Sequence, residues 1–197
     1  RIGFRVSGSF YDTEGFIDNA FLGEEADPYQ DLALRGNLLF DLGSGWEIDL
    51  RASMDRLRTQ ALYFNIVSDV NDTSLPVRVN NAGQNDRDIH NLAAKISYEG
   101  EHFGVTSITS YDTVEEILTG DAFDFLPIQE SLFFFLFGED WNQSQFLDVE
   151  AISQELRLES PPDEKLFWMF GGYLIATDRY ISTGNMADTG AGVFPVY

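Results

Sequence analysis

Carboxylate side chains gather in two long stretches of the sequence, at about 12–30 and 112–148, and neither stretch contains a Lys or Arg. Calcium takes about six to eight oxygen ligands, many of them carboxylates. In the first stretch the motif DTEGFIDN places four oxygen-bearing side chains near one another in sequence: Asp12, Glu14, Asp18 and Asn19. Their spacing is not that of an EF-hand. They form a candidate calcium site, and calcium is the only cofactor suggested. The competing interpretation is a solvated acidic surface.

The second stretch also carries a dense group of aromatic side chains, in FDFLPIQESLFFFLFGEDW. Exposed aromatic patches mark binding or association surfaces. The candidate ligand contacts are Phe123, Phe125, Phe134 and Trp141. The competing interpretation is that this loop folds as a small strand or helix and buries its aromatic side chains against its neighbours.

Arrangements typical of catalysis find little support. Glu115 and Glu116 match a glycosidase pair in residue type only, and adjacent acids arise by chance in a chain with 33 Asp and Glu residues. His90 and His102 are expected near opposite ends of one strand, too far apart to share a metal ion. The chain has no Cys, and no Ser lies in a recognisable nucleophile motif. We therefore expect no enzymatic activity.

Composition narrows the class of protein further. A formal net charge of −21 repels nucleic-acid phosphates, so no nucleic-acid partner is expected. With 44% hydrophobic and 14% aromatic residues, the chain is too apolar to be disordered throughout. No run of about 18 apolar residues is present, so no transmembrane helix is expected.

The elements that must position these residues are strands, because apolar and polar residues alternate along most of the chain. The clearest example flanks the turn GSG, with apolar residues on one face and charged residues on the other. The apolar set is Leu32, Leu34, Leu38, Phe40 and Leu42 before the turn, and Trp46, Ile48, Leu50, Ala52 and Met54 after it. Each run suits a tilted membrane strand of about 9–11 residues. In a later run Phe103 and Val105 begin a return strand, and Ile108 is expected to break its register.

The connections between these runs alternate between short and long. Short turns are expected at about 43–45, 100–102 and 160–165, and long external loops at about 12–30, 56–88 and 112–148. Outer-membrane barrels sort their connections in this way. The expected fold is therefore all-β, an antiparallel up-and-down meander of about seven long strands that forms part of a large transmembrane β-barrel.

Side chains on the two expected faces fit a barrel wall. Aromatic residues beside the short turns are expected to form an interfacial girdle: Phe40, Trp46, Tyr98, Phe103 and Trp168. Basic residues on the polar face are expected to pair with acidic residues on adjacent strands. These basic residues are Arg35, Arg51, Lys95 and Arg157.

Three blocks of sequence resemble strands of TonB-dependent outer-membrane receptors: YDTEGFIDN followed by DLALRGNLLFDLGSGWEIDLRAS, then TSITSYD, then ISQELRLESPPDEKLFWMFGGYLI. The resemblance covers about half of the chain. It implies a plugged barrel of about 22 strands in the Gram-negative outer membrane, of which 1–197 would be a partial barrel domain. Such receptors import scarce nutrients, namely iron chelates including siderophores, vitamins or glycans.

The resemblance also implies partners. These are outer-membrane lipid, a small-molecule nutrient or iron chelate, and the TonB complex, reached through an N-terminal region that this sequence does not contain. Neither a plug nor a C-terminal insertion signal is recognisable in it.

Two other architectures fit the same alternation. One is a soluble, secreted β-sandwich that binds glycans or calcium and buries the apolar faces of two sheets against each other. The other is an assembly in which truncated sheets pair edge to edge, because an open sheet has two reactive edges.

Overall fold

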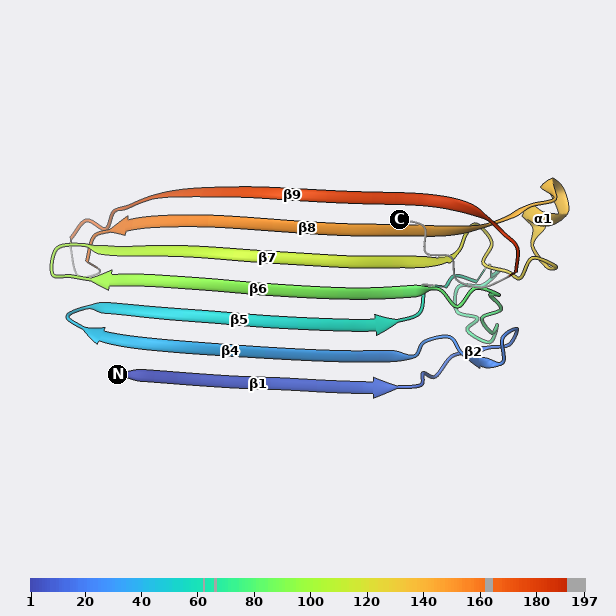
Figure 1. Ribbon diagram of the computed structural model, residues 1–197, viewed down its shortest axis with the longest axis horizontal. Helices are drawn as coiled ribbons and strands as arrows, with labels where there is room; N and C mark the ends of the chain where they lie inside the picture. Colours follow the sequence, from blue (N-terminus) through green and yellow to red (C-terminus); the bar gives the residue numbers. More distant parts are fainter. Residues whose placement is uncertain (62, 66, 162–164, 191–197) are drawn as a thin grey trace.

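The chain folds into one large antiparallel sheet with long loops at one end (Figure 1). The computed structural model describes residues 1–61, 63–65, 67–161 and 165–190. The strands of the large sheet are β1 (Ile2–Thr13), β4 (Tyr29–Gly43), β5 (Trp46–Thr59), β6 (Gln84–Glu99), β7 (Gly104–Asp121), β8 (Asp140–Glu159) and β9 (Met169–Asp188). A two-stranded sheet, β2 (Asp18–Asn19) with β3 (Glu24–Glu25), lies in the first loop.

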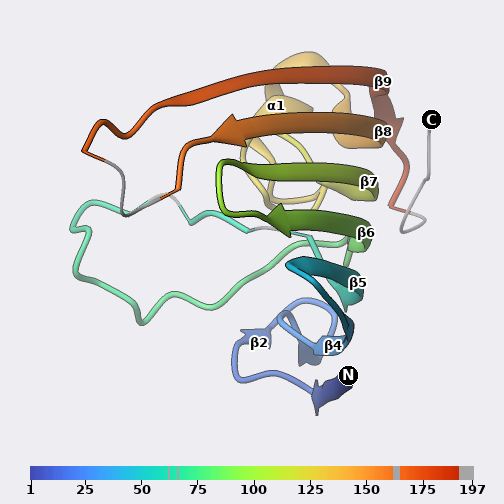
Figure 2. The same ribbon diagram turned by 90° about the vertical axis from the view of Figure 1, so that its left-hand side faces the viewer.

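The seven strands pair in chain order, each antiparallel to the next, so the expected all-β meander is confirmed. The view along the sheet shows a single layer that does not close on itself, with β1 at one edge and β9 at the other (Figure 2). The described residues contain no second large sheet, so the two packed sheets of a sandwich are not formed among them.

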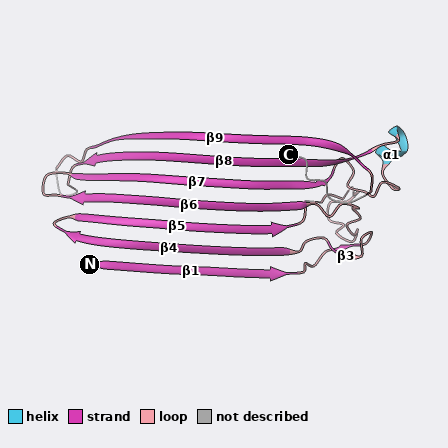
Figure 3. Ribbon diagram, viewed as in Figure 1, coloured by secondary structure: helices cyan, strands magenta, loops and turns pink. Residues whose placement is uncertain are grey.

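The short turns lie at one end of the sheet and the long loops at the other, as expected (Figure 3). Ser44 and Gly45 connect β4 to β5 with positive φ angles of 53° and 84°. A side chain at Gly45 would overlap the carbonyl oxygen of Glu99 in the neighbouring strand, which explains why glycine stands there. The expected turn at 160–165 includes positions 162–164, which lie outside the described residues.

The long loops are shorter than expected because the strands extend into them. The loops run over 14–28, 60–83 and 122–139, whereas the sequence suggested 12–30, 56–88 and 112–148. β7 and β8 stay paired out to Asp121 and Asn142, where the alternation of apolar residues has already faded. Backbone pairing with a neighbouring strand holds these ends extended without help from an apolar pattern.

Ile108 does not break the register, contrary to the expectation. It pairs with Lys95 on one side and Glu155 on the other, within continuous ladders. It is therefore an apolar residue on the polar face, and Val105 remains on the apolar face opposite Tyr98.

The register defines two faces of different chemistry. One row across the sheet runs Phe4, Leu38, Leu50, Ala94, Thr109, Gln154 and Leu174, and we call the side that carries it the apolar face. Its large side chains are open to solvent in the isolated chain, with Phe4 79% and Leu174 76% exposed. The opposite side is the polar face.

Buried hydrophobic residues are few and lie mainly among the loops. Ala26, Val77 and Val79 form a small cluster, against which Tyr63 and Phe125 pack. Within the described chain, most of both faces of the sheet is therefore left without a packed layer. The buried hydrophobic residues lie at the loop end.

Candidate functional site at the loop end

The three long loops are joined by one short segment, 77–83, which we call the central segment. Val77 O accepts a hydrogen bond from Ala20 N at 2.8 Å, and Val79 O accepts one from Asn19 Nδ2 at 3.0 Å. Both bonds tie the central segment to the first loop. Arg78 forms an ion pair with Glu130 of the third loop. The central segment thus connects loops that are far apart in sequence.

The central segment is also bound to the ends of the last strands. Asn80 Nδ2 donates to Asp188 Oδ2 at 2.8 Å, and Asn81 Nδ2 donates to Asn142 Oδ1 at 2.8 Å. Asn81 is fully buried, with 0% exposure, and its Oδ1 accepts from Gly83 N. These amide side chains were not identified from the sequence, because their partners are 108 and 61 residues away along the chain.

The aromatic loop forms a short helix, α1 (Leu132–Phe137), at the far tip of the molecule (Figure 1). Ser131 caps its first turn by accepting from Phe134 N, and Gly138 ends it. None of its residues is buried, and Phe135 is 83% exposed. The loop folds as a small helix, as the competing interpretation held, but it does not bury its aromatic residues.

The four candidate ligand contacts do not form one cluster. Phe123 stacks on Phe133 with ring centroids 4.7 Å apart, whereas Phe125 meets Phe64 edge-on at 5.2 Å. Among the described residues no ring contact joins Trp141 to either pair. Phe123 and Phe134 are exposed and accessible to a ligand. The ligand-contact hypothesis stays a prediction.

The candidate calcium residues are spread over two elements. Asp12 lies near the end of β1, while Asp18 and Asn19 form β2. Asn19 is buried, and its Oδ1 already accepts from the backbone N–H groups of two loop residues. Within the described ranges, no group of three or more His, Asp or Glu side chains is placed to hold a metal ion. Calcium binding by Asp12, Glu14, Asp18 and Asn19 stays a prediction.

Three buried carboxylates lie near one another at the ends of β7, β8 and β9: Asp121, Asp140 and Asp188. Asp188 and Asp121 are next to the central segment. Burial, with a further contribution from the charges of Asp188 and Asp140, raises the pKa of Asp121 to about 8. Burial also raises the pKa of Asp140. No sequence pattern signals this group, because Asp121 and Asp140 belong to a long acidic stretch that is expected to be solvated, and Asp188 belongs to no motif. Register alone brings them together, since Asp140 pairs with Asp188, and Asp121 with Asn142.

A second charged group lies on the same side of the sheet as the apolar face, near the ends of the strands that lead into the long loops. Arg58 Nη2 donates to Asp88 Oδ2 at 2.6 Å, and Arg56 Nε donates to Asp88 Oδ1 at 3.0 Å. Asp86 lies 3.8 Å from Arg58 Nε. The sequence predicts a loop for these residues, but they stand on β5 and β6, where adjacent strands bring them together.

The ion pairs of the polar face match the expected cross-strand pairing only in part. Arg51 pairs with Asp49 and Arg157 with Glu155, each two residues away on the same strand, and not with a residue of a neighbouring strand. Residues two apart on a strand point to the same face. Arg35 does reach an adjacent strand, at 3.9 Å from Asp55.

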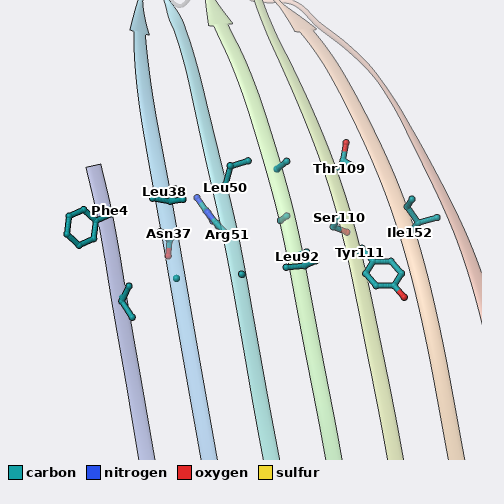
Figure 4. A pocket seen from close by; sticks show the side chains of 15 residues that line it. Phe4, Asn37, Leu38, Leu50, Arg51, Leu92, Thr109, Ser110, Tyr111 and Ile152 are labelled. Carbon is teal, nitrogen blue, oxygen red and sulfur yellow. The ribbon is translucent and has the colours of Figure 1, made fainter. Parts of the chain in front are cut away.

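The apolar face has a broad depression of ≈ 650 Å³ across strands β1 to β8 (Figure 4). Its lining includes large side chains such as Phe4, Leu50 and Ile152 and small residues such as Gly36 and Ala52. At the short-turn end the Trp46 and Tyr98 ring centroids are 4.9 Å apart, and those of Tyr98 and Phe103 are 5.7 Å apart. The interfacial girdle stays a prediction. No helix in the described parts of the chain is long and apolar enough to cross a membrane.

No protein-family model matches the chain, and no solved structure matches its fold.

Proposed function

We propose that this chain is part of the barrel wall of a TonB-dependent outer-membrane receptor, which captures a scarce nutrient with its external loops and imports it with inner-membrane energy. The sequence blocks described above suggest the family. The distribution of charge between the two faces of the sheet is the observation that carries the proposal.

Near the short turns, four successive rows of the apolar face contain no Asp, Glu, Lys or Arg. On β5 these rows pass through Trp46, Ile48, Leu50 and Ala52. On the polar face every strand carries a charged residue. Each of these residues lies at the same level as the four uncharged rows or just past the last of them. These residues are Arg5, Arg35, Asp49, Lys95, Asp112, Glu155 and Arg179. Lipid-facing and lumen-facing residues of an outer-membrane barrel alternate in this way.

The charged boundary of the apolar face runs obliquely across the strands. On β5, β6 and β7 the first charged residues are Arg56, Asp88 and Glu115, which stand in one row. On β1 the first charged residue, Asp12, lies two positions closer to the long loops than that row. On β8 the first charged residue, Glu150, lies two positions closer to the short turns. From β1 to β8 the offset is four residues, or roughly 13 Å, over five strand spacings of about 4.8 Å. The resulting slope is about 29°, and barrel strands tilt by about 35–45°.

The open edges fit a segment of a larger barrel. β1 and β9 each lack a partner on their outer side within the described chain. Unpaired edges invite pairing with further strands, and in the proposed receptor those strands complete the barrel. The long acidic loops and the exposed aromatic residues of α1 then lie on the external side, where a ligand arrives.

The facing of the sheet is tested by single cysteines in the full-length receptor, in membranes. These 197 residues contain no Cys, so each introduced thiol in this segment is unambiguous. Leu50→Cys and Ala52→Cys should react with a lipid-soluble maleimide and resist a charged one. Arg51→Cys and Ser53→Cys, on the opposite face, should react with the charged reagent. Equal labelling of all four by the charged reagent would refute a lipid-facing surface.

Import is tested separately, by deleting residues 122–139 from the full-length receptor. Uptake is measured for a panel of ferric chelates, cobalamin and oligosaccharides. We expect the deletion to abolish uptake of one of these compounds while the barrel still reaches the membrane. A receptor that imports none of them, with or without the loop, contradicts the transport function and leaves the facing result unaffected.

A further inference from the structure

The buried polar group beneath the central segment contains hydrogen-bonding atoms without partners. Asp121 is only 4% exposed, yet neither oxygen of its carboxylate has a hydrogen-bond partner. Asn80 Oδ1, Thr119 Oγ1 and Asn142 Nδ2 are also buried and unpartnered. These atoms come from the second loop and from the ends of β7 and β8. Buried polar groups are normally paired, so this concentration needs an explanation.

The charge of this group is equally uncompensated. Asp188 and Asp140 are buried near Asp121, and no ion pair formed within the described residues reaches any of the three. The backbone N–H groups of Asn80 and Asn81 lie on the Asp121 side and favour its ionised form, but neither makes a hydrogen bond of good geometry to it. An isolated buried carboxylate is costly and escapes that cost by binding a cation or a proton.

The types of the unpartnered atoms favour a proton over a metal ion. A protonated carboxyl group carries one O–H donor and keeps an acceptor oxygen. Its O–H matches the unpartnered Asn80 Oδ1, and its other oxygen matches the unpartnered Asn142 Nδ2 donor. A metal ion would satisfy the oxygens only, and it would face the N–H groups of Asn80, Asn81 and Asn142. No group of three acidic or His side chains in the described residues is placed to hold one.

We propose that Asp121 is a proton-binding site that latches the external loops: the neutral carboxylic acid holds the central segment against β7, β8 and β9, and ionisation releases it. Asp121 lies six residues beyond Glu115 on β7, roughly 20 Å past the charged boundary, so it is outside the proposed membrane span. The latch does not depend on the barrel being in a membrane. It would make access to the ligand surface respond to external pH.

The direction of the pH dependence follows from the two states of the latch. When the central segment is released, Asp121 is solvated and has the ordinary pKa of 3.8, whereas in the closed state its pKa is about 8. The latch is therefore fully effective below pH 3.8 and weakens as the pH rises. The ratio of open to closed should increase about tenfold per pH unit. It should level off above a pH of about 8. The neighbouring carboxylates of Asp188 on β9 and Asp140 on β8 both oppose ionisation of Asp121. Tyr63 of the second loop also faces Asp121, whose charge helps to raise the pKa of that phenol above its usual value, so Tyr63 stays neutral over this pH range.

Hydrogen exchange of peptides covering 77–83, corrected for the intrinsic pH dependence of exchange, tests the latch in the full-length receptor. Wild-type protection should fall about tenfold per pH unit between pH 5 and 8. Asp121→Asn, which is neutral at every pH, should remove most of that dependence. Asp72→Asn is the matched control, since Asp72 is an exposed residue of the same loop whose carboxylate bonds only locally to Ser74.

Asp188→Asn is a second variant, in case Asp121→Asn does not fold. It keeps an acceptor for Asn80 and removes a charge that raises the pKa of Asp121, so the levelling-off should move to lower pH. Wild-type protection that does not change with pH, or an unchanged pH profile in both Asp121→Asn and Asp188→Asn, overturns the proposal. Protection that rises with millimolar Ca²⁺ in wild type and is insensitive to it in Asp121→Asn also overturns it, in favour of a metal site.

Discussion

Gly83 is the position where one added methyl group should disturb the loop end most. It ends the central segment with a φ of +67°. A Cβ at this position would overlap the carbonyl oxygen of Thr119 and the Cβ of Ala61, and would lie 3.1 Å from Gly120 Cα. Two costs therefore combine in Gly83→Ala. A left-handed conformation costs an L-residue about 1–2 kcal/mol, and overpacking adds about 1–3 kcal/mol.

Gly23→Ala separates the two costs. Gly23 also has a positive φ, +74°, but a Cβ there would meet no atom within 4 Å. It should show the conformational cost alone, about 1–2 kcal/mol. For Gly83→Ala the sum is about 2–5 kcal/mol, which corresponds to roughly 30-fold to a few thousandfold more opening.

The assay is hydrogen exchange of the loop that carries each substitution, measured in the whole protein at constant pH. Gly83→Ala should increase opening of residues 60–83 far more than Gly23→Ala increases opening of residues 14–28. If the two variants raise the opening of their own loops to within threefold of each other, the close approach of Gly83 to β7 is not part of the folded structure, and the reasoning fails.

Three further substitutions have expected outcomes of known direction. Asn81→Ala leaves two buried hydrogen-bonding partners unsatisfied, and should weaken protection of the central segment by about 2–5 kcal/mol. Ser131→Ala removes the cap of α1, and should speed exchange of its amides by an amount equivalent to about 1 kcal/mol, which Ser131→Thr largely restores. If the apolar face meets lipid as proposed, Leu92→Arg should reduce the amount of folded protein in the membrane, with a penalty of about 2–4 kcal/mol. Ala93→Arg, the next residue on the polar face, should be tolerated, and equal loss in both would contradict the facing.

The strands and their faces were accessible from the sequence because strand alternation is a local property. Leu50 and Arg51 point to opposite faces whatever surrounds them, since successive side chains of a strand alternate. The turn between β4 and β5 was equally clear, because its glycines permit positive φ angles. Ile108 shows the limit of this reasoning. One apolar residue on a polar face suggested a shifted register, but two neighbouring strands hold the register continuous.

The extent of the loops was less accessible. Arg56 and Asp88 fall at the two ends of the long loop expected over about 56–88. They stand on paired strands, where each is the other's cross-strand neighbour. A strand that continues beyond its apolar rows needs no apolar pattern, because the backbone ladder holds it. Likewise, α1 was one of the forms considered for the aromatic loop, but the exposure of its aromatic residues could not be read from their types.

The sequence by itself determined the meander, the alternation of short and long connections and the separation of charged from apolar faces. All of these follow from residues that are neighbours along the chain or across one hairpin. Only the tertiary structure decided the polar group around Asp121. The Asn80–Asp188 and Asn81–Asn142 bonds join residues 108 and 61 positions apart. Whether a carboxylate in an acidic stretch is solvated or buried depends on which loop folds over it, and that is set by strand register and loop packing together.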